Sequence, residues 1–78
     1  MAKVNVVNLT RRDKERNTIQ TETEASYTVF EMDGERYFQI DTYGTRYRKE
    51  QGKVSQVLQF DEESVKLLIK LLTTEFRF

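Results

Sequence analysis

Apolar and polar residues alternate over several short stretches of the chain, which predicts strands before any helix. Residues 3–9 alternate loosely and predict a short first strand. Residues 25–32 and 35–42 form two longer alternating runs on either side of Asp33-Gly34. That dipeptide is typical of a two-residue hairpin turn, which needs positive φ at both positions. Gly adopts positive φ freely, and Asp does so more readily than most residues. We therefore expect a β-hairpin centred on Asp33 and Gly34.

The period of the pattern changes from strand to helix near Asp61. Residues 54–60 alternate and predict another strand. Asp61 then has the side chain of a helix N-cap, and Glu62 and Glu63 follow where the helix dipole favours negative charge. The apolar spacing after them predicts a helix over residues 62–75. The expected fold is α+β: a small antiparallel sheet of about four strands with one C-terminal helix.

Residues 10–22 carry almost no hydrophobic signal, since Ile19 is their one large aliphatic residue. Too little apolar surface is available there to offset the entropy of ordering, so we expect a mobile connection within one small domain, residues 1–78. The connection carries four cations: Arg11, Arg12, Lys14 and Arg16. We interpret them as a solvated polar segment, with a basic arm that orders on phosphate as the alternative.

Alternation also assigns residues to the two faces of the hairpin. Phe38 and Ile40 share a face that we expect to be core, whereas the opposite face of the same arm looks solvated, with Tyr37 and Tyr43 on it. The side chains that we expect to be largely buried are Phe30, Phe38, Ile40, Leu58, Phe60, Val65, Leu68, Ile69 and Leu72.

The predicted helix has two apolar stripes where a single sheet needs only one. The first consists of Val65, Leu68, Ile69, Leu72 and Phe76, and the second of Leu67, Leu71 and Phe78. Small domains gain stability from further burial, so we assign the second stripe to a homodimer interface. The alternative is that the N-terminal strand or its linker folds over Leu67 and Leu71.

Composition excludes several classes of site. The 78 residues contain neither Cys nor His, so disulfides and the usual zinc ligands are absent from the sequence. A nucleophile would have to be Ser, Thr, Lys or a carboxylate, and no Gly-rich phosphate motif accompanies the acids. We expect no enzymatic activity, no catalytic residue, no metal and no cofactor. The chain also lacks an apolar run of membrane-spanning length, so we expect a cytoplasmic protein without a membrane partner.

Charge is balanced overall but uneven along the chain. The sequence has 13 basic and 13 acidic residues, so its formal net charge is zero. This argues against a strongly basic nucleic-acid clamp. Residues 1–20 and 43–60 each have a balance of +3, whereas residues 21–42 have a balance of −5. Any site for anions must therefore be local.

The segment after the hairpin gives the clearest functional indication. Cations and rings are interleaved there, and cations contact phosphates while aromatic rings stack on bases. The alternative is that residues 43–53 are a solvated connection between strands, where charged side chains are expected without any binding role. The predicted nucleic-acid-binding residues are Tyr37, Tyr43, Arg46, Tyr47, Arg48, Lys49 and Lys53.

Residues 35–72 resemble the single-stranded DNA-binding domain of the transcriptional coactivator positive cofactor four and its short bacterial and phage relatives. Two strings carry the resemblance: Phe38-Gln39-Ile40-Asp41-Thr42-Tyr43, and Gly52-Lys53 followed by Leu58-Gln59-Phe60-Asp61-Glu62-Glu63. The resemblance implies a homodimer whose helices pack on each other and whose curved sheets present basic and aromatic side chains. Asp41 and Gly44 depart from it, since the family has a cation and an aromatic residue there.

We therefore expect a homodimeric module that binds single-stranded nucleic acid with little sequence preference and acts as a transcription or replication accessory protein. The rival hypothesis is a small phage or mobile-element regulator that acts by binding a host protein. Zero net charge and the acidic hairpin suit that rival equally well.

Overall fold

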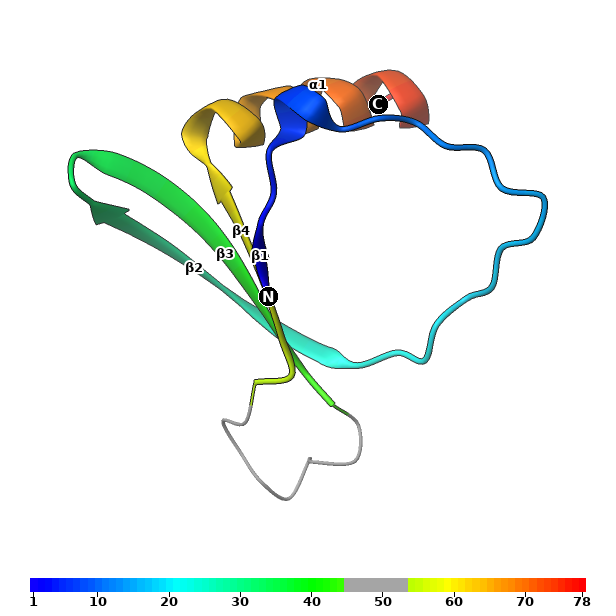
Figure 1. Cartoon of the computed structure of the whole chain (residues 1–78), viewed down its shortest axis with the longest axis horizontal. Helices are drawn as coiled ribbons and strands as arrows, with labels where there is room; N and C mark the ends of the chain where they lie inside the picture. The colour runs from blue at the N-terminus through cyan, green and yellow to red at the C-terminus, as the bar shows by residue number, and fades with distance from the viewer. Residues whose placement is uncertain (45–53) are drawn as a thin grey trace.

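The computed structural model describes residues 1–44 and 54–78 as a mixed four-stranded sheet with one C-terminal helix (Figure 1). This is the α+β arrangement expected from the sequence. Its elements, in chain order, are β1 (Ala2–Lys3), the 3-10 turn η1 (Val6–Asn8), β2 (Glu24–Met32), β3 (Glu35–Tyr43), β4 (Gln56–Asp61) and α1 (Glu62–Phe76).

The sheet has the strand order β1-β4-β3-β2, in which β1 runs parallel to β4 and the other neighbours are antiparallel. The hairpin prediction is confirmed, because β2 and β3 pair without interruption from Glu24 opposite Tyr43 to Met32 opposite Glu35. Asp33 and Gly34 have φ angles of 54° and 78°, as a type I′ turn requires.

The strand predicted over residues 3–9 is found only in part. After two residues of β1 the chain turns into η1, and the backbone amides at this point bond to side chains instead of extending the pairing with β4. The Asn5 carboxamide oxygen accepts from the Val7 amide at 3.1 Å, and the Ser64 hydroxyl accepts from the Val6 amide at 3.1 Å. A capped turn docked on the helix therefore replaces the second half of the expected strand.

The predicted helix is confirmed within one residue of its expected end. Asp61 is the N-cap, and its carboxylate accepts from the Ser64 amide at 2.8 Å. That backbone hydrogen bond is the main reason that the pKa of Asp61 lies below its ordinary value. Desolvation opposes it, and the Ser64 hydroxyl and the charge of Lys3 add smaller lowering effects. Arg77 closes the helix in the left-handed conformation, with φ of 56°.

Strand register divides the sheet into an apolar and a polar face. On the apolar face, Tyr27 and Val29 lie opposite Ile40 and Phe38, and Leu58 and Phe60 continue the same rows on β4. Phe30 is on the other face, opposite Tyr37. The expectation that Phe30 shares a core with Phe38 is therefore wrong, because the uninterrupted hairpin register gives the two rings opposite parity.

The core of the single chain is smaller than expected. Among the described residues, the buried hydrophobic side chains are Val6 and Phe60, and the buried polar one is Ser64. Phe38, Ile40, Phe30, Val65 and Leu68 are half-buried instead of largely buried. Burial was wrongly predicted for three more side chains, which are exposed: Leu58, Ile69 and Leu72.

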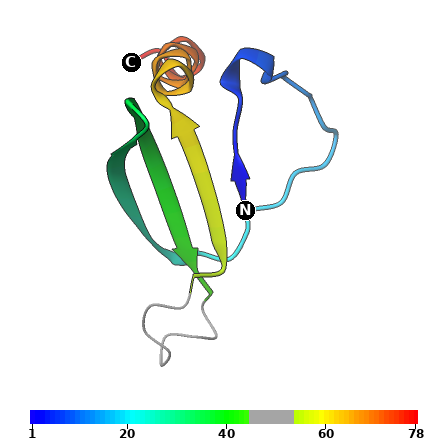
Figure 2. The same ribbon diagram turned by 60° about the vertical axis from the view of Figure 1, so that its left-hand side comes forward.

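The placement of α1 explains this shortfall. The helix starts at the end of β4 and extends past the sheet, so that only its first turns lie close to the strands (Figures 1 and 2). Ser64 in the first turn is 2% exposed, whereas Ile69 and Phe76 further along the helix are 61% and 66% exposed. One helix in this position covers only one end of the apolar face.

The N-terminal segment covers part of the second helical stripe. Leu67 and Leu71 line an open groove of about 310 Å³ together with Val6 and Leu9. Both leucines remain 36–40% exposed. For these two side chains, the structure thus has the alternative that the sequence left open, a contact with the N-terminal segment. Phe78 does not line this groove, and its ring stacks on that of Phe76 with centroids 5.9 Å apart.

Residues 9–23 contain no helix or strand and run as a wide arc from η1 to the start of β2 (Figure 1). Every residue of the arc is exposed, and Ile19 is fully so. The predicted absence of regular structure is found, while its mobility stays a prediction.

Candidate nucleic-acid interface

The polar face of the sheet carries the described part of the predicted site. Odd-numbered residues of β3 point to this face, so Tyr37 and Tyr43 share it with their partners Phe30 and Glu24 on β2. The two tyrosines are six positions apart along the strand, or about 20 Å at ~3.3 Å per residue. Rings so far apart would contact different nucleotides of a bound strand.

Tyr37 belongs to a small aromatic and cationic cluster. Its ring stacks on that of Phe30, with centroids 5.3 Å apart and an interplanar angle of 25°. The ammonium nitrogen of Lys3 lies 5.7 Å from the centroid of the Tyr37 ring and 3.9 Å from a carboxylate oxygen of Asp61. Both rings are half-buried. The cluster thus combines a supported ring, whose orientation is restrained by its neighbour, with an adjacent cation.

A chain of side-chain hydrogen bonds crosses the middle of the same face. The Gln59 amide donates to the Gln39 carbonyl oxygen at 2.7 Å, and the Gln39 amide donates to the Asp41 carboxylate at 2.8 Å. At the far end of β3, the hydroxyls of Tyr43 and Ser26 are 2.8 Å apart. These bonds hold flat polar groups in place between the two tyrosines.

The charge of this face does not favour phosphate. Strand register puts four carboxylates on it, those of Glu24, Glu35, Asp41 and Asp61, and Lys3 is its one cation among the described strand residues. Asp41, at the position where the resembling family has a cation, lies in the centre of this face and accepts a hydrogen bond from the Gln39 side chain. The described face offers rings and amides to bases but little attraction for a polyanion.

Five of the predicted residues lie outside the described part of the chain: Arg46, Tyr47, Arg48, Lys49 and Lys53. In the sequence they follow directly on Tyr43 and Gly44. The structure thus brings together Tyr37 and Tyr43 on one face.

Two members of the aromatic and cationic cluster were missed by the sequence reasoning. Phe30 was assigned to the core, although the turn at Asp33-Gly34 pairs residue 30 with residue 37 by simple counting. Lys3 gave no signal, because its position beside Tyr37 depends on the parallel pairing of β1 with β4. The first omission was avoidable from the sequence, and the second was not.

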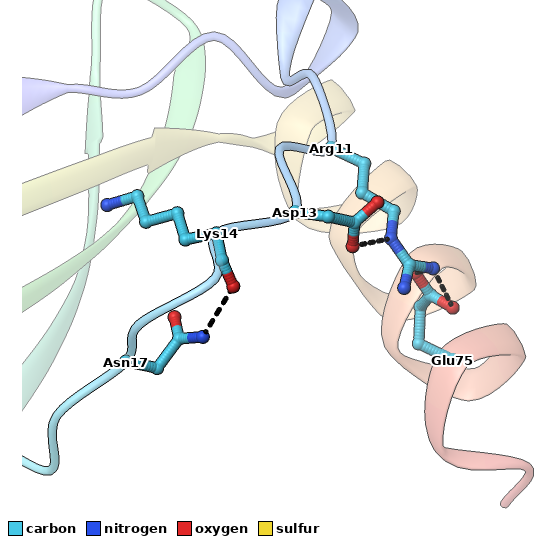
Figure 3. Close-up of polar contacts among 5 residues, drawn as sticks. All are labelled: Arg11, Asp13, Lys14, Asn17 and Glu75. Carbon is cyan, nitrogen blue, oxygen red and sulfur yellow. Dashed lines mark hydrogen bonds and ion pairs between the residues drawn. The ribbon is translucent and has the colours of Figure 1, made fainter.

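The basic segment 11–16 is tied to the helix at its first cation. The Arg11 guanidinium lies 3.0 Å from the Asp13 carboxylate and 3.1 Å from that of Glu75 near the end of α1 (Figure 3). The Lys14 carbonyl accepts a hydrogen bond from the Asn17 side chain at 3.0 Å. All these contacts are exposed, so each contributes little to stability, but they direct the charge of Arg11 to protein carboxylates.

No family model matches the chain, and comparison with curated proteins and with solved structures gives no significant match. Within the described residues, no helix combines the length and hydropathy needed to cross a membrane.

Proposed function

We propose that the chain is a homodimeric module that binds single-stranded nucleic acid with little sequence preference. The observation that carries the proposal is the Phe30–Tyr37 stack with Lys3 beside it, on the same sheet face as Tyr43. A bound strand would lie along β3, with bases stacking near both tyrosines. Stacking of this kind contributes about 1–3 kcal/mol per base and does not depend strongly on base identity.

Phosphate contacts in this proposal come from the basic segment that follows Tyr43. Arg46, Arg48, Lys49 and Lys53 supply at most four contacts in each chain. Since each phosphate contact with a single strand contributes about 0.7 to the salt slope, the slope should not exceed about 3 in magnitude for a strand bound by one chain, or about 6 for a strand that spans both chains of the dimer. The carboxylates on the sheet face lower the affinity further. A role as a transcription or replication accessory protein in the cytoplasm of a prokaryote or an infected host fits such weak binding.

The test is binding of a labelled 20-mer single strand and of its duplex, each at two salt concentrations. We expect preference for the single strand and a small salt slope. Tyr37→Ala should weaken binding about fivefold to 150-fold, the equivalent of one stacked base, without changing that slope. Tyr27→Ala is the matched control, because Tyr27 is a 70% exposed strand tyrosine on the opposite face. Equal losses for both variants would contradict the assignment of the binding face.

The second candidate is a protein-interaction module, such as a small phage or mobile-element regulator that binds a host protein. The four carboxylates on the polar face favour it, because they attract a basic protein surface and repel a phosphate backbone. Absence of any affinity for single strands at low salt, together with tight binding to a purified protein partner, would replace the first proposal by this one.

A further inference from the structure

The hairpin strand β2 forms a long open edge of the sheet. It is the last strand in the order β1-β4-β3-β2, and among the described residues no segment pairs with its outer side (Figure 2). Eight of its nine residues are exposed, and Phe30 is half-buried. The opposite edge is short, because β1 has only two residues. The sheet therefore offers one long edge to which a further strand can be added.

The backbone groups that β2 directs to this edge follow from the hairpin turn. The two-residue turn closes on Met32 and Glu35, which as its flanking pair are hydrogen-bonded to each other. Bonded and non-bonded pairs alternate along an antiparallel ladder, so the even-numbered residues of β2 bond to β3. The odd-numbered residues direct their amides and carbonyls outward, where no backbone hydrogen bond between described residues uses them: Ala25, Tyr27, Val29 and Glu31.

β2 lacks the features that commonly protect an edge strand from pairing. Such strands are short, or carry Pro, Lys or a bulge. β2 contains neither Pro nor Lys, and its register with β3 is continuous over all nine residues, so no bulge interrupts it. At about 3.3 Å per residue it is roughly 30 Å long. Its outward amides and carbonyls are therefore evenly spaced and open to a partner strand.

The charge of the hairpin determines which kind of strand the edge attracts. Residues 21–42 carry six acids and one cation, a balance of −5. Glu24 begins β2, Glu31 lies one residue before its end, and Asp33 follows in the turn. Pairing with the same edge of a second copy would bring two equally acidic segments together. A basic strand is attracted where a second copy is repelled.

We infer that the free edge of β2 binds an extended basic peptide segment of another protein, which adds a strand to the sheet. Main-chain hydrogen bonds to the outward amides and carbonyls hold the peptide, and side chains at alternate positions select it. The added strand runs antiparallel to β2, because antiparallel pairs are slightly more stable than parallel ones.

The register of the sheet gives the sequence pattern of the peptide. Its residues opposite Val29 and Tyr27 are apolar, since they extend the apolar rows that cross the sheet at these two positions. Its cations lie towards the ends, opposite Glu24 and Glu31. Glu31 already has an exposed ion pair with Arg36 at 3.2 Å, so Glu24 is the better position at which to test the charge.

The inference goes beyond single-strand binding and does not depend on it. It concerns the edge of the sheet, whereas the proposed nucleic-acid interface is the polar face that carries Tyr37. It also supplies the second candidate function with a partner chemistry: a basic segment that is extended when bound.

A synthetic peptide tests the edge directly. It spans β2 from Glu31 to Glu24 in antiparallel register, with blocked ends, lysine at both terminal positions, valine opposite Val29 and Tyr27, and threonine elsewhere. Its binding to the wild-type chain is measured by fluorescence polarisation. One N-methyl group on the valine opposite Val29 removes an amide that faces β2, whereas the matched control has the N-methyl group on the residue opposite Thr28, whose amide faces solvent.

We expect the first N-methyl group to weaken binding about tenfold or more, because it removes a hydrogen bond to β2, and the second to weaken it less than about twofold. Equal losses for the two peptides would overturn the inference. Absence of binding of the unmodified peptide at about 1 mM would overturn it as well.

Hydrogen exchange of the protein amides locates the bound peptide. At a saturating peptide concentration, exchange at Tyr27 and Val29 should slow about tenfold or more, while exchange at Thr28, which already bonds to β3, changes little. Slowing on another element instead of β2 would overturn the inference. Protection of Tyr27 and Val29 that rises with protein concentration in the absence of peptide would assign the edge to a second copy, and would overturn it too.

Charge reversal tests whether the partner is basic. Glu24→Lys should weaken peptide binding about threefold or more at low salt, because repulsion replaces attraction at the end of β2. Glu15→Lys makes the same change of net charge in the arc 9–23 and should have a smaller effect, and both positions are exposed, so circular dichroism should show both variants folded. Equal effects of the two variants would overturn the assignment of a basic partner. Single-strand binding is tested separately through Tyr37→Ala, so failure of either proposal leaves the other standing.

Discussion

Phe60→Ala is the substitution with the largest expected effect on the stability of the single chain. Phe60 is 8% exposed and is the largest buried side chain among the described residues. Its ring centroid lies 6.4 Å from that of Phe38, so the substitution also removes an aromatic contact. A buried Phe removes roughly 150–250 Å² from water, which at about 25 cal/mol per Å² amounts to ~4–6 kcal/mol. Ala retains the β-carbon, which brings the expected loss to ~3–5 kcal/mol.

That loss is large compared with the total stability. A domain of this length has a free energy of unfolding of about 4–12 kcal/mol. Phe60→Ala should therefore lower the urea midpoint steeply or abolish folding, whereas Phe60→Leu should cost less because most of the volume remains. Circular dichroism at 222 nm during urea titration measures both effects, and one protein concentration must be used throughout because the proposed dimer would add to the apparent stability.

Val29→Ala provides the matched control, because Val29 belongs to the same apolar face but is 55% exposed. Its cost should be under about 1 kcal/mol, as for most exposed positions. Nearly equal midpoints for Phe60→Ala and Val29→Ala would refute the reasoning, since burial would then not distinguish the two positions. The same comparison tests the conclusion that the core of one chain is confined to the surroundings of Phe60 and Val6.

Three further predictions concern individual backbone contacts. Ser64→Ala should cost about 1–3 kcal/mol, because it leaves the Val6 amide without its acceptor in a buried place, and hydrogen exchange at Val6 should accelerate. Gly34→Ala should cost about 1 kcal/mol in a urea titration through its positive φ alone, since an added β-carbon would meet no atom within 4 Å. The lowered pKa of Asp61 means that its contribution to stability is present above the ordinary value of 3.8 and is lost as pH falls through the folded value. Asp61→Asn keeps a good cap and should remove that part of the acid dependence, so an unchanged acid titration of stability would contradict the assignment.

Local structure followed from the sequence because its causes are local. The turn at Asp33-Gly34 needs positive φ at neighbouring positions, and those two residue types adopt it readily. Asp61 marks the start of α1 because its carboxylate satisfies an amide only three residues away. The register of β2 on β3 follows from the length of the turn. A two-residue turn at Asp33-Gly34 already places Phe30 opposite Tyr37.

Burial, by contrast, was decided by the tertiary structure. Helical spacing shows which side chains of α1 share a side but not which side meets the sheet or η1. Leu67 and Leu71 line the groove beside the N-terminal segment, whereas Ile69 is 61% exposed. The position of Lys3 beside Tyr37 depends on β1 pairing with β4, more than fifty residues away. The sequence by itself determined the hairpin, its register and the capped helix, because these depend on neighbouring residues. It did not predict η1, where the Val6 amide bonds to Ser64, 58 residues along the chain. The tertiary structure alone decided which apolar faces are covered, because packing depends on contacts between residues far apart in the chain.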